Sequence, residues 1–167
     1  MSIDGDGGKG EIEEQVRRFG QRLRNHRRQA GLSQLALAER AGVDLAAVSF
    51  LERAKRAPNL ATLVRVARAA GVSPATLIAD GPPPPEPPAR RRRGRGASDP
   101  LVRFGANLRA ARKSAGMSQE MLAQTARLDR AAISIIERGG RSANLRTILK
   151  LARALKVAPE DLLVGVD

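Results

Sequence analysis

Two Ser-Gln pairs lie at equivalent points of the sequence and carry side chains that can bind an anion. Ser33–Gln34 and Ser118–Gln119 stand 85 residues apart, and each serine lies two residues after a glycine. Serine is a favoured cap at a helix N-terminus, where free backbone N–H groups and the helix dipole attract phosphate. One interpretation is that the serines only cap their helices. The other, which we expect, is that the serines cap the helices while Gln34 and Gln119 contact phosphate.

The chain lacks the residues that most catalytic and metal sites need. It has no cysteine and one histidine, which excludes a disulfide framework, a thiolate metal site and a histidine cluster. No nucleophile with its base, no paired carboxylates and no phosphate loop are recognisable. His26 falls on the apolar face of its helix, so we expect a packed neutral side chain. We therefore expect no enzyme, no cofactor and no metal.

The charge of the chain indicates a polyanionic partner. Thirty Lys and Arg against seventeen Asp and Glu give a net charge of +13, and nucleic acid is the first candidate for such a surplus. A GC-rich genome, which favours Arg and Ala codons, is the alternative source of this charge. No apolar run approaches the length of a membrane span, and the first residues lack a signal-peptide pattern. We expect a cytoplasmic, nucleoid-associated protein with no membrane partner.

The sequence contains an internal repeat. Residues 19–78 align with residues 104–163 without a gap and with 28 identities in 60 positions, so each half is one copy of a single unit. Between them, GPPPPEPPARRRRGRGASD favours a stiff polyproline II rod followed by a flexible Arg-Gly run. We expect a disordered tail (1–10), a first domain (11–80), a linker (81–99) that spaces the halves, and a second domain (100–167).

Each unit is predicted to be an all-α bundle of five short helices. Only two residues, Gly42–Val43 or Arg127–Leu128, separate the second and third helices, which is the tight connection of a helix-turn-helix. Capping residues mark where helices two to five begin. These caps are Ser33, Asp44, Asn59 and Ser73–Pro74 in the first unit, and Ser118, Asp129, Asn144 and Ala158–Pro159 in the second.

The segments LRNHRRQAGLSQLALAERAGVDLAAVSFLERAKRAPNLATLVRVARAAGVSPATL and LRAARKSAGMSQEMLAQTARLDRAAISIIERGGRSANLRTILKLARALKVAPEDL resemble the Xre, or lambda-repressor and Cro, family of DNA-binding domains. The elements R-x-x-x-G-x-S-Q, L-A and S-x-x-E-R occur twice at the same spacing, and the resemblance covers about 120 of 167 residues. It implies two tandem five-helix lambda-repressor-like domains. In each, helix two lies across the DNA backbone and helix three enters the major groove.

The exposed positions of the third helices are the predicted base readers. Arg130 can donate two hydrogen bonds to guanine, whereas Leu45 and Phe50 offer only apolar contact, for instance with thymine methyl groups. Alternatively, Leu45 and Phe50 cover a protein interface, as large exposed apolar side chains often do. The full predicted set is Leu45, Ala46, Ser49, Phe50, Arg130, Ala131, Ser134 and Ile135.

Polar and basic residues around these helices are expected to contact phosphates. They are Ser33, Gln34, Arg53, Arg56, Ser118, Gln119, Arg127, Arg138 and Arg141. In the linker, a basic run is expected to enter an AT-rich minor groove or to neutralise phosphates, with a solvated linker as the alternative. That run contains Arg90, Arg91, Arg92, Arg93 and Arg95.

The resemblance also implies two partly buried structural ion pairs, Arg27 with Glu52 and Arg112 with Glu137. A glutamate at the end of a helix is disfavoured by the helix dipole, so a fixed partner is expected. Two residues depart from the family pattern, because Arg127 and Ala54 stand where it has glycine. A left-handed backbone at either position would be strained unless the turn adjusts.

The sequence therefore predicts a sequence-specific, double-stranded DNA-binding transcriptional regulator in which each domain reads one half-site. The alternative is that one domain binds DNA and the other is a dimerisation or partner-binding module, including an antitoxin-like autoregulator. Double-stranded DNA is the expected partner. A homodimer and a contact with RNA polymerase are further partners that the sequence leaves open.

Overall fold

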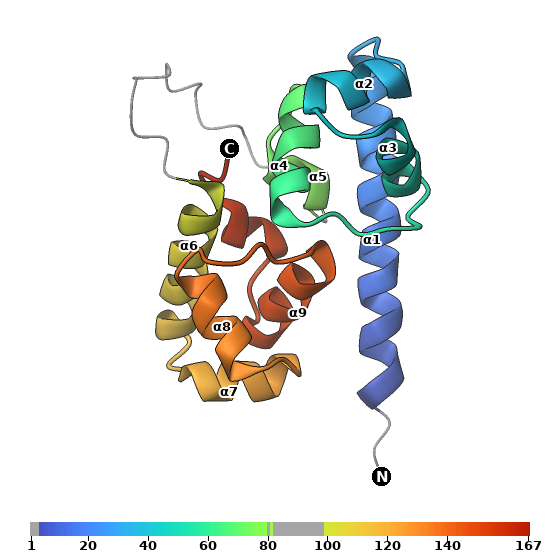
Figure 1. The fold of residues 1–167 in the computed structure, drawn as a ribbon. Helices are drawn as coiled ribbons and strands as arrows, with labels where there is room; N and C mark the ends of the chain where they lie inside the picture. The colour runs from blue at the N-terminus through green and yellow to red at the C-terminus, as the bar shows by residue number, and fades with distance from the viewer. Residues whose placement is uncertain (1–3, 80, 82–98) are drawn as a thin grey trace.

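The structure, a computed structural model, describes residues 4–79, 81 and 99–167. These residues form nine α-helices and one 3-10 helix and contain no strand, so the predicted all-α class with two helix-turn-helix units is confirmed (Figure 1). The first half contains α1 (Asp4–Gln29), α2 (Gln34–Ala41), α3 (Leu45–Glu52), α4 (Leu60–Ala69) and α5 (Pro74–Ile78). The second contains α6 (Pro100–Ser114), α7 (Gln119–Ala126), α8 (Arg130–Glu137), α9 (Leu145–Leu155) and η1 (Pro159–Leu163). None of the described helices combines the length and the hydropathy that a membrane crossing requires.

Capping residues set most helix boundaries, as the sequence predicts. The side chains of Ser33, Asn59 and Ser73 each accept a hydrogen bond from the backbone N–H three residues further on. Gly42 ends α2 with a φ of 59°, a left-handed conformation that glycine adopts without a steric penalty. Asp44 occupies the cap position of α3, but its side chain accepts no capping hydrogen bond.

The fifth helix of the second unit begins after Ala158, as predicted, and is a 3-10 helix in which Asp161 N–H donates to the Ala158 carbonyl at 3.0 Å. One expectation about the ends of the units is wrong. The N-terminal tail, predicted to be disordered, is helical from Asp4 onward. Its glycines disfavour a helix, but tertiary contacts override this weak preference. The first turns of α1 lie against α9, where Ile12 is buried and Glu13 pairs with Arg146.

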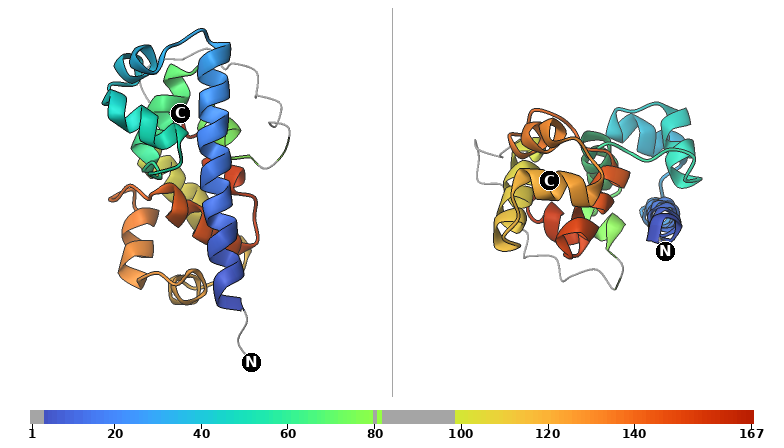
Figure 2. Two further views of the ribbon diagram at one scale, coloured as in Figure 1. Left: turned by 90° about the vertical axis from the view of Figure 1, so that its right-hand side faces the viewer. Right: turned by 90° about the horizontal axis from the view of Figure 1, so that it is seen from below.

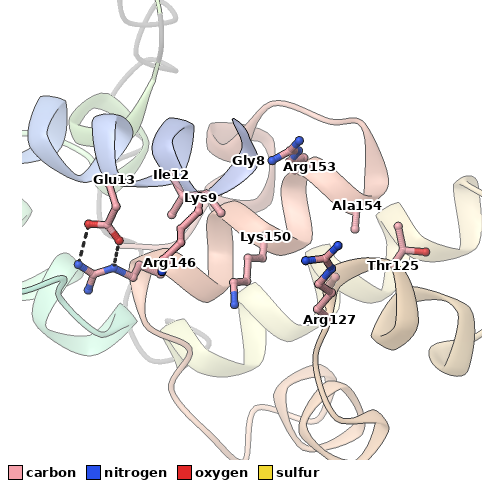
Figure 3. A pocket seen from close by; sticks show the side chains of 11 residues that line it. Gly8, Lys9, Ile12, Glu13, Thr125, Arg127, Arg146, Lys150, Arg153 and Ala154 are labelled. Carbon is pink, nitrogen blue, oxygen red and sulfur yellow. Dashed lines mark hydrogen bonds and ion pairs between the residues drawn. The ribbon is translucent and has the colours of Figure 1, made fainter. Parts of the chain in front are cut away.

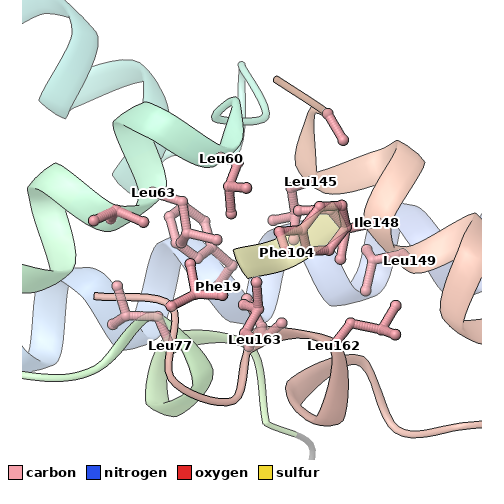
Figure 4. Close-up of a cluster of buried hydrophobic side chains, with 14 of the residues drawn as sticks. Phe19, Leu60, Leu63, Leu77, Phe104, Leu145, Ile148, Leu149, Leu162 and Leu163 are labelled. Carbon is pink, nitrogen blue, oxygen red and sulfur yellow. The ribbon is translucent and has the colours of Figure 1, made fainter. Parts of the chain in front are cut away.

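The two halves contact each other directly, whereas the sequence led us to expect halves spaced by the linker. Residues 82–98, most of that linker, lie outside the described residues. A single cluster of buried apolar side chains runs through both halves and includes Phe19, Leu63, Phe104 and Ile148 (Figure 4). Each such buried side chain contributes about 1.5–3 kcal/mol to stability. The hydrophobic effect therefore holds the halves together.

The contacts between the halves are reciprocal. Leu60 N–H donates to the Ala143 carbonyl at 2.8 Å, and Leu145 N–H donates to the Pro58 carbonyl at 2.8 Å. These two bonds are equivalent under the 85-residue offset of the repeat, and they flank an antiparallel bridge between Asn59 and its counterpart Asn144. The helix contacts follow the same symmetry. α1 contacts α9, and their counterparts α6 and α4 contact each other, while α5 contacts its own counterpart η1. Reciprocity of this kind defines a pseudo-twofold axis between the halves.

Candidate nucleic-acid interface

The helix pairs α2–α3 and α7–α8 lie along one side of the molecule. Figure 2 (left) shows all four helices on that side, with α1 running past them. Because a pseudo-twofold axis relates the halves, α3 and α8 are equivalent elements presented together. This is the arrangement that helix-turn-helix proteins need to place two recognition helices on one duplex.

Two glycines allow α1 and α6 to approach the recognition helices closely. A Cβ on Gly20 would lie 2.6 Å from the Leu51 carbonyl oxygen, and a Cβ on Gly105 would lie 2.5 Å from that of Ile136. Any side chain would therefore push α3 or α8 away from its supporting helix. A role for these two glycines was not predicted from the sequence, although each follows a phenylalanine at the same position of its repeat.

Each recognition helix is fixed at its end by a buried carboxylate network. Arg27 Nε lies 2.5 Å from Glu52 Oε1 and its Nη2 lies 3.1 Å from Oε2, while its Nη1 donates to the Leu32 carbonyl at 2.7 Å. Gln34 Nε2 also donates to Glu52 Oε2, at 2.8 Å. The network joins α1, the loop before α2, α2 itself and α3. The structure thus contains the ion pair that the resemblance implies, and adds Gln34 to it.

The second half repeats this network. Arg112 pairs with Glu137 at 2.6 Å and 3.0 Å, and Gln119 Nε2 donates to Glu137 Oε2 at 2.9 Å. Burial raises the pKa of Glu52 and of Glu137, but the hydrogen bonds from arginine and glutamine outweigh it. The pKa of each carboxyl is held below its ordinary value. Both glutamates are therefore ionised and paired at neutral pH.

The base-reading candidates line the outer faces of α3 and α8. Leu45 and Phe50 are 47% and 42% exposed, and the main packing partners of their helix, α3, are α1 and α2 of the same half. In α8, Arg130 is exposed and its Nε lies 3.9 Å from Glu120 Oε2. Of the other candidates, Ala46 and Ala131 are exposed, and Ser49, Ser134 and Ile135 are half-buried.

The phosphate-contact candidates gather around the same helices. Ser33 and Ser118 Oγ accept from backbone N–H groups at 3.0 Å and 3.1 Å, so both serines cap α2 and α7. The amides of Gln34 and Gln119 are oriented by their bonds to the buried glutamates. Of the basic candidates, Arg53, Arg56, Arg127, Arg138 and Arg141 are all exposed.

Arg127 and Ala54 retain the left-handed backbone in place of glycine. Their φ angles are 52° and 55°, so neither turn adjusts. Such a conformation costs a residue with a Cβ about 1–2 kcal/mol. In the other half, the equivalent positions are Gly42, with a φ of 59°, and Gly139, with a φ of 72°.

Other candidates contribute nothing to this surface that can be described. His26 is half-buried on α1 and does not belong to a cluster of metal-ligating side chains among the described residues. The linker residues Arg90 to Arg93 and Arg95 lie outside the described residues. Within residues 4–79, 81 and 99–167, no group of three or more metal-ligating side chains is assembled.

Comparison with known proteins finds the same unit in each half. The family HTH_3, described as Helix-turn-helix, matches residues 23–77 and 108–162. Control protein C.BamHI of Bacillus amyloliquefaciens is 49% identical over 61 residues, which are 36% of this chain and 75% of that protein. An uncharacterized HTH-type transcriptional regulator of Methanothermobacter thermautotrophicus is 43% identical over 49 residues, which are 29% of this chain and 71% of that protein.

Among solved structures, the restriction-modification controller protein C.AhdI from Aeromonas hydrophila shares 48% sequence identity and a TM-score of 0.37. The similarity covers 37% of this chain and 94% of that one. The two curated relatives are matched over most of their own length by about a third of this chain. A relative of this kind corresponds to one half.

Proposed function

The chain belongs to the HTH_3 helix-turn-helix family of DNA-binding transcriptional regulators, and from that premise we propose that one chain reads both halves of a two-part operator. The observation that carries the proposal is the reciprocal pair of hydrogen bonds between Leu60 and Ala143 and between Leu145 and Pro58. A pseudo-twofold axis in the protein matches a pseudo-palindromic site in DNA, because the two recognition helices then meet equivalent half-sites.

The proposal gives the two halves different chemistry. In the second half, Arg130 donates to the two acceptors of guanine, with Ala131, Ser134 and Ile135 beside it. In the first half, Leu45 and Phe50 make apolar contacts with thymine methyl groups. The operator is therefore pseudo-symmetric, with one half-site richer in A·T pairs. Neither a second copy of the chain nor RNA polymerase is required for binding to it.

Phosphate contacts set the position of each half on the duplex. The free amides at the N-termini of α2 and α7 lie beside Gln34 and Gln119, where a phosphate binds a helix dipole. Arg53, Arg56, Arg138 and Arg141 add charge at the ends of α3 and α8. The linker arginines, Arg90 to Arg93 and Arg95, contribute further contacts to phosphates or to the minor groove.

The rival function, in which one half has become an interaction module, depends on Leu45 and Phe50. These side chains remain exposed, and the contact between the halves is made by other elements. This supports a role for them toward DNA. We propose domains that correspond to residues 4–80 and 100–167, joined by the linker at 81–99.

Selection of bound sequences from random duplex DNA tests the proposal. The expected result is two related half-sites centred about one helical turn apart, with sedimentation showing one chain per duplex. A single half-site, unchanged when Leu45 and Phe50 are both replaced by alanine, would instead show that only the second half reads DNA.

A further inference from the structure

A pocket that shares only Arg127 with the predicted operator contacts lies between the first turns of α1, the end of α7 and α9. Its volume is about 490 Å³, within the range of small-molecule sites. Figure 3 shows the side chains around it, which come from both halves of the chain. Five of them are cations, namely Lys9, Arg127, Arg146, Lys150 and Arg153.

Acidic side chains neutralise only part of this charge. Glu13 accepts from Arg146 Nε at 2.7 Å and from its Nη2 at 2.9 Å. Glu11 lies 3.8 Å from Arg153. Among the side chains that the structure describes, no acid pairs with Arg127 or Lys150. The pocket therefore keeps an excess of positive charge, carried mainly by side chains that remain exposed to solvent.

The equivalent position in the first half is built differently. Gly42 stands in place of Arg127, and Ala61 in place of Arg146. Arg65, the counterpart of Lys150, donates to the carbonyl of Gly42. The hollow there is lined by Arg40, Ala41, Arg65, Arg68 and Ala69, without any residue of α1. Both hollows thus carry cations, but only the second half has arginines at the positions of Gly42 and Ala61.

Arg127 keeps its place in spite of a strained backbone. Its φ of 52° is one that glycine adopts freely, and the first half has Gly42 at this position. Where an arginine stands in a strained backbone conformation that glycine would adopt without strain, the arginine side chain is expected to have a role of its own. That side chain lines the pocket, and its backbone forms the connection between α7 and α8.

We propose that this pocket binds a small anion with several adjacent phosphate groups, and that the bound anion changes operator affinity through Arg127. Guanidinium and ammonium groups spaced around a cavity match the oxygens of neighbouring phosphates. None of the residues that line the pocket belongs to α8, so the anion and the operator share only Arg127 among the predicted DNA contacts. Occupancy is transmitted because Arg127 lies two residues before Asp129, the cap of α8.

Titration calorimetry of the full chain with inorganic tripolyphosphate, at physiological ionic strength, tests the site. We expect one strong site per chain and at least a tenfold loss of affinity in the double variant Arg127→Gly, Lys150→Ala. Glycine fits the left-handed turn, so this variant folds, and Lys150→Glu gives an independent check. The matched control, Arg65→Ala with Arg68→Ala in the first half, should leave the affinity unchanged. Equal losses in both double variants would show diffuse attraction and overturn the proposal.

A second arm separates a free phosphate compound from the DNA backbone. In this arm the variant is Lys9→Ala with Lys150→Ala, because Arg127 is itself a predicted phosphate contact. Without tripolyphosphate, this variant should bind the selected operator as the wild type does. Added tripolyphosphate should shift operator affinity in the wild type and not in the variant. If the variant instead loses affinity for every duplex, with a smaller salt dependence and unchanged tripolyphosphate binding, these cations serve the DNA backbone and the proposal is wrong. Failure of the chain to select a two-part operator would leave the tripolyphosphate result intact.

Discussion

Glu52 and Glu137 each tie four segments of a helix-turn-helix unit together through one carboxylate. An arginine of the supporting helix donates hydrogen bonds to both oxygens of the carboxylate, and a glutamine from the first turn of α2 or α7 donates to one of them. The same glutamine stands at the helix N-terminus where a phosphate is proposed to bind. The network therefore sets the orientation of a glutamine that is predicted to contact DNA, as well as the position of α3 or α8.

Replacing Arg27 by methionine should destabilise the first unit by about 3 kcal/mol, because Glu52 is then left buried without its cation. Thermal unfolding followed by circular dichroism measures the change. The control is Arg17→Met, which removes an exposed pair with Glu14 and should cost less than about 0.5 kcal/mol. Equal melting temperatures for the two variants would mean that the Arg27 pair contributes no more than a surface pair.

The same carboxylates make stability depend on pH. Their folded pKa values lie below the unfolded value of about 4.3, since hydrogen bonds to Arg27, Gln34 and their counterparts outweigh burial. The pairs thus stabilise the chain fully above pH 4.3, and this stabilisation is lost as the pH falls through the lower folded values. Urea unfolding midpoints should fall between pH 5 and pH 3. In Glu52→Gln the midpoint at pH 7 should be lower and its decrease with acid shallower, and an unaltered acid response would exclude Glu52 as a cause.

Arg130 is the residue with the sharpest expected effect on specificity. Arg130→Ala should cost about 1–3 kcal/mol on the selected operator and little on random duplex DNA, because a bidentate bond to guanine is lost. Competition binding with both duplexes measures the ratio. Equal losses on the two would make Arg130 a phosphate contact. Glu120→Gln is the companion variant, since its carboxylate lies 3.9 Å from Arg130, and it should bind both duplexes slightly more tightly.

At the scale of the elements, helix ends were more predictable than helix lengths. Ser33, Asn59 and Ser118 act through hydrogen bonds within three residues, so the sequence alone reveals them. The length of α1 depends on a surface 133 residues away in the sequence, where Glu13 pairs with Arg146. No local pattern carries that information, which is why the glycine-rich start was expected to be disordered.

The left-handed turns predict how substitutions at two equivalent positions, Ala54 and Gly139, change stability. Ala54→Gly should stabilise the chain by about 0.5–1 kcal/mol, because relief of the left-handed strain exceeds the entropy that glycine adds to the unfolded state. The reverse change, Gly139→Ala, should destabilise by more, since its Cβ would also lie 2.9 Å from Val102 Cα. Urea unfolding at neutral pH measures both. Destabilisation by Ala54→Gly would show that the alanine methyl contributes more through packing than it costs in strain.

At the scale of the whole molecule, the sequence predicted the repeat but did not predict that its two copies pack against each other. An 85-residue offset identifies two units, and the S-x-x-E-R elements locate the recognition helices. Apolar positions such as Leu60, Leu77 and Leu162 look the same whether they face their own unit or the other. The Pro-rich linker suggested separation, whereas the buried cluster joins the halves.

The joined halves predict how the linker acts in operator binding. A protease site inserted between Pro88 and Ala89 allows the covalent link to be cut without a change in either unit. The intact chain should bind the selected operator as one species, with a binding curve that follows chain concentration to the first power.

After cleavage, the halves should stay associated at micromolar concentration through the contacts of Leu60 and Leu145 and separate on dilution. Operator affinity should then fall at least tenfold at nanomolar concentration, because the effective concentration that a linker supplies, on the order of millimolar, is lost. Gel shifts of cut and uncut protein at matched concentrations measure this. Identical curves at every dilution would mean that the contact between the halves alone maintains the reading surface, and that the linker contributes nothing to affinity.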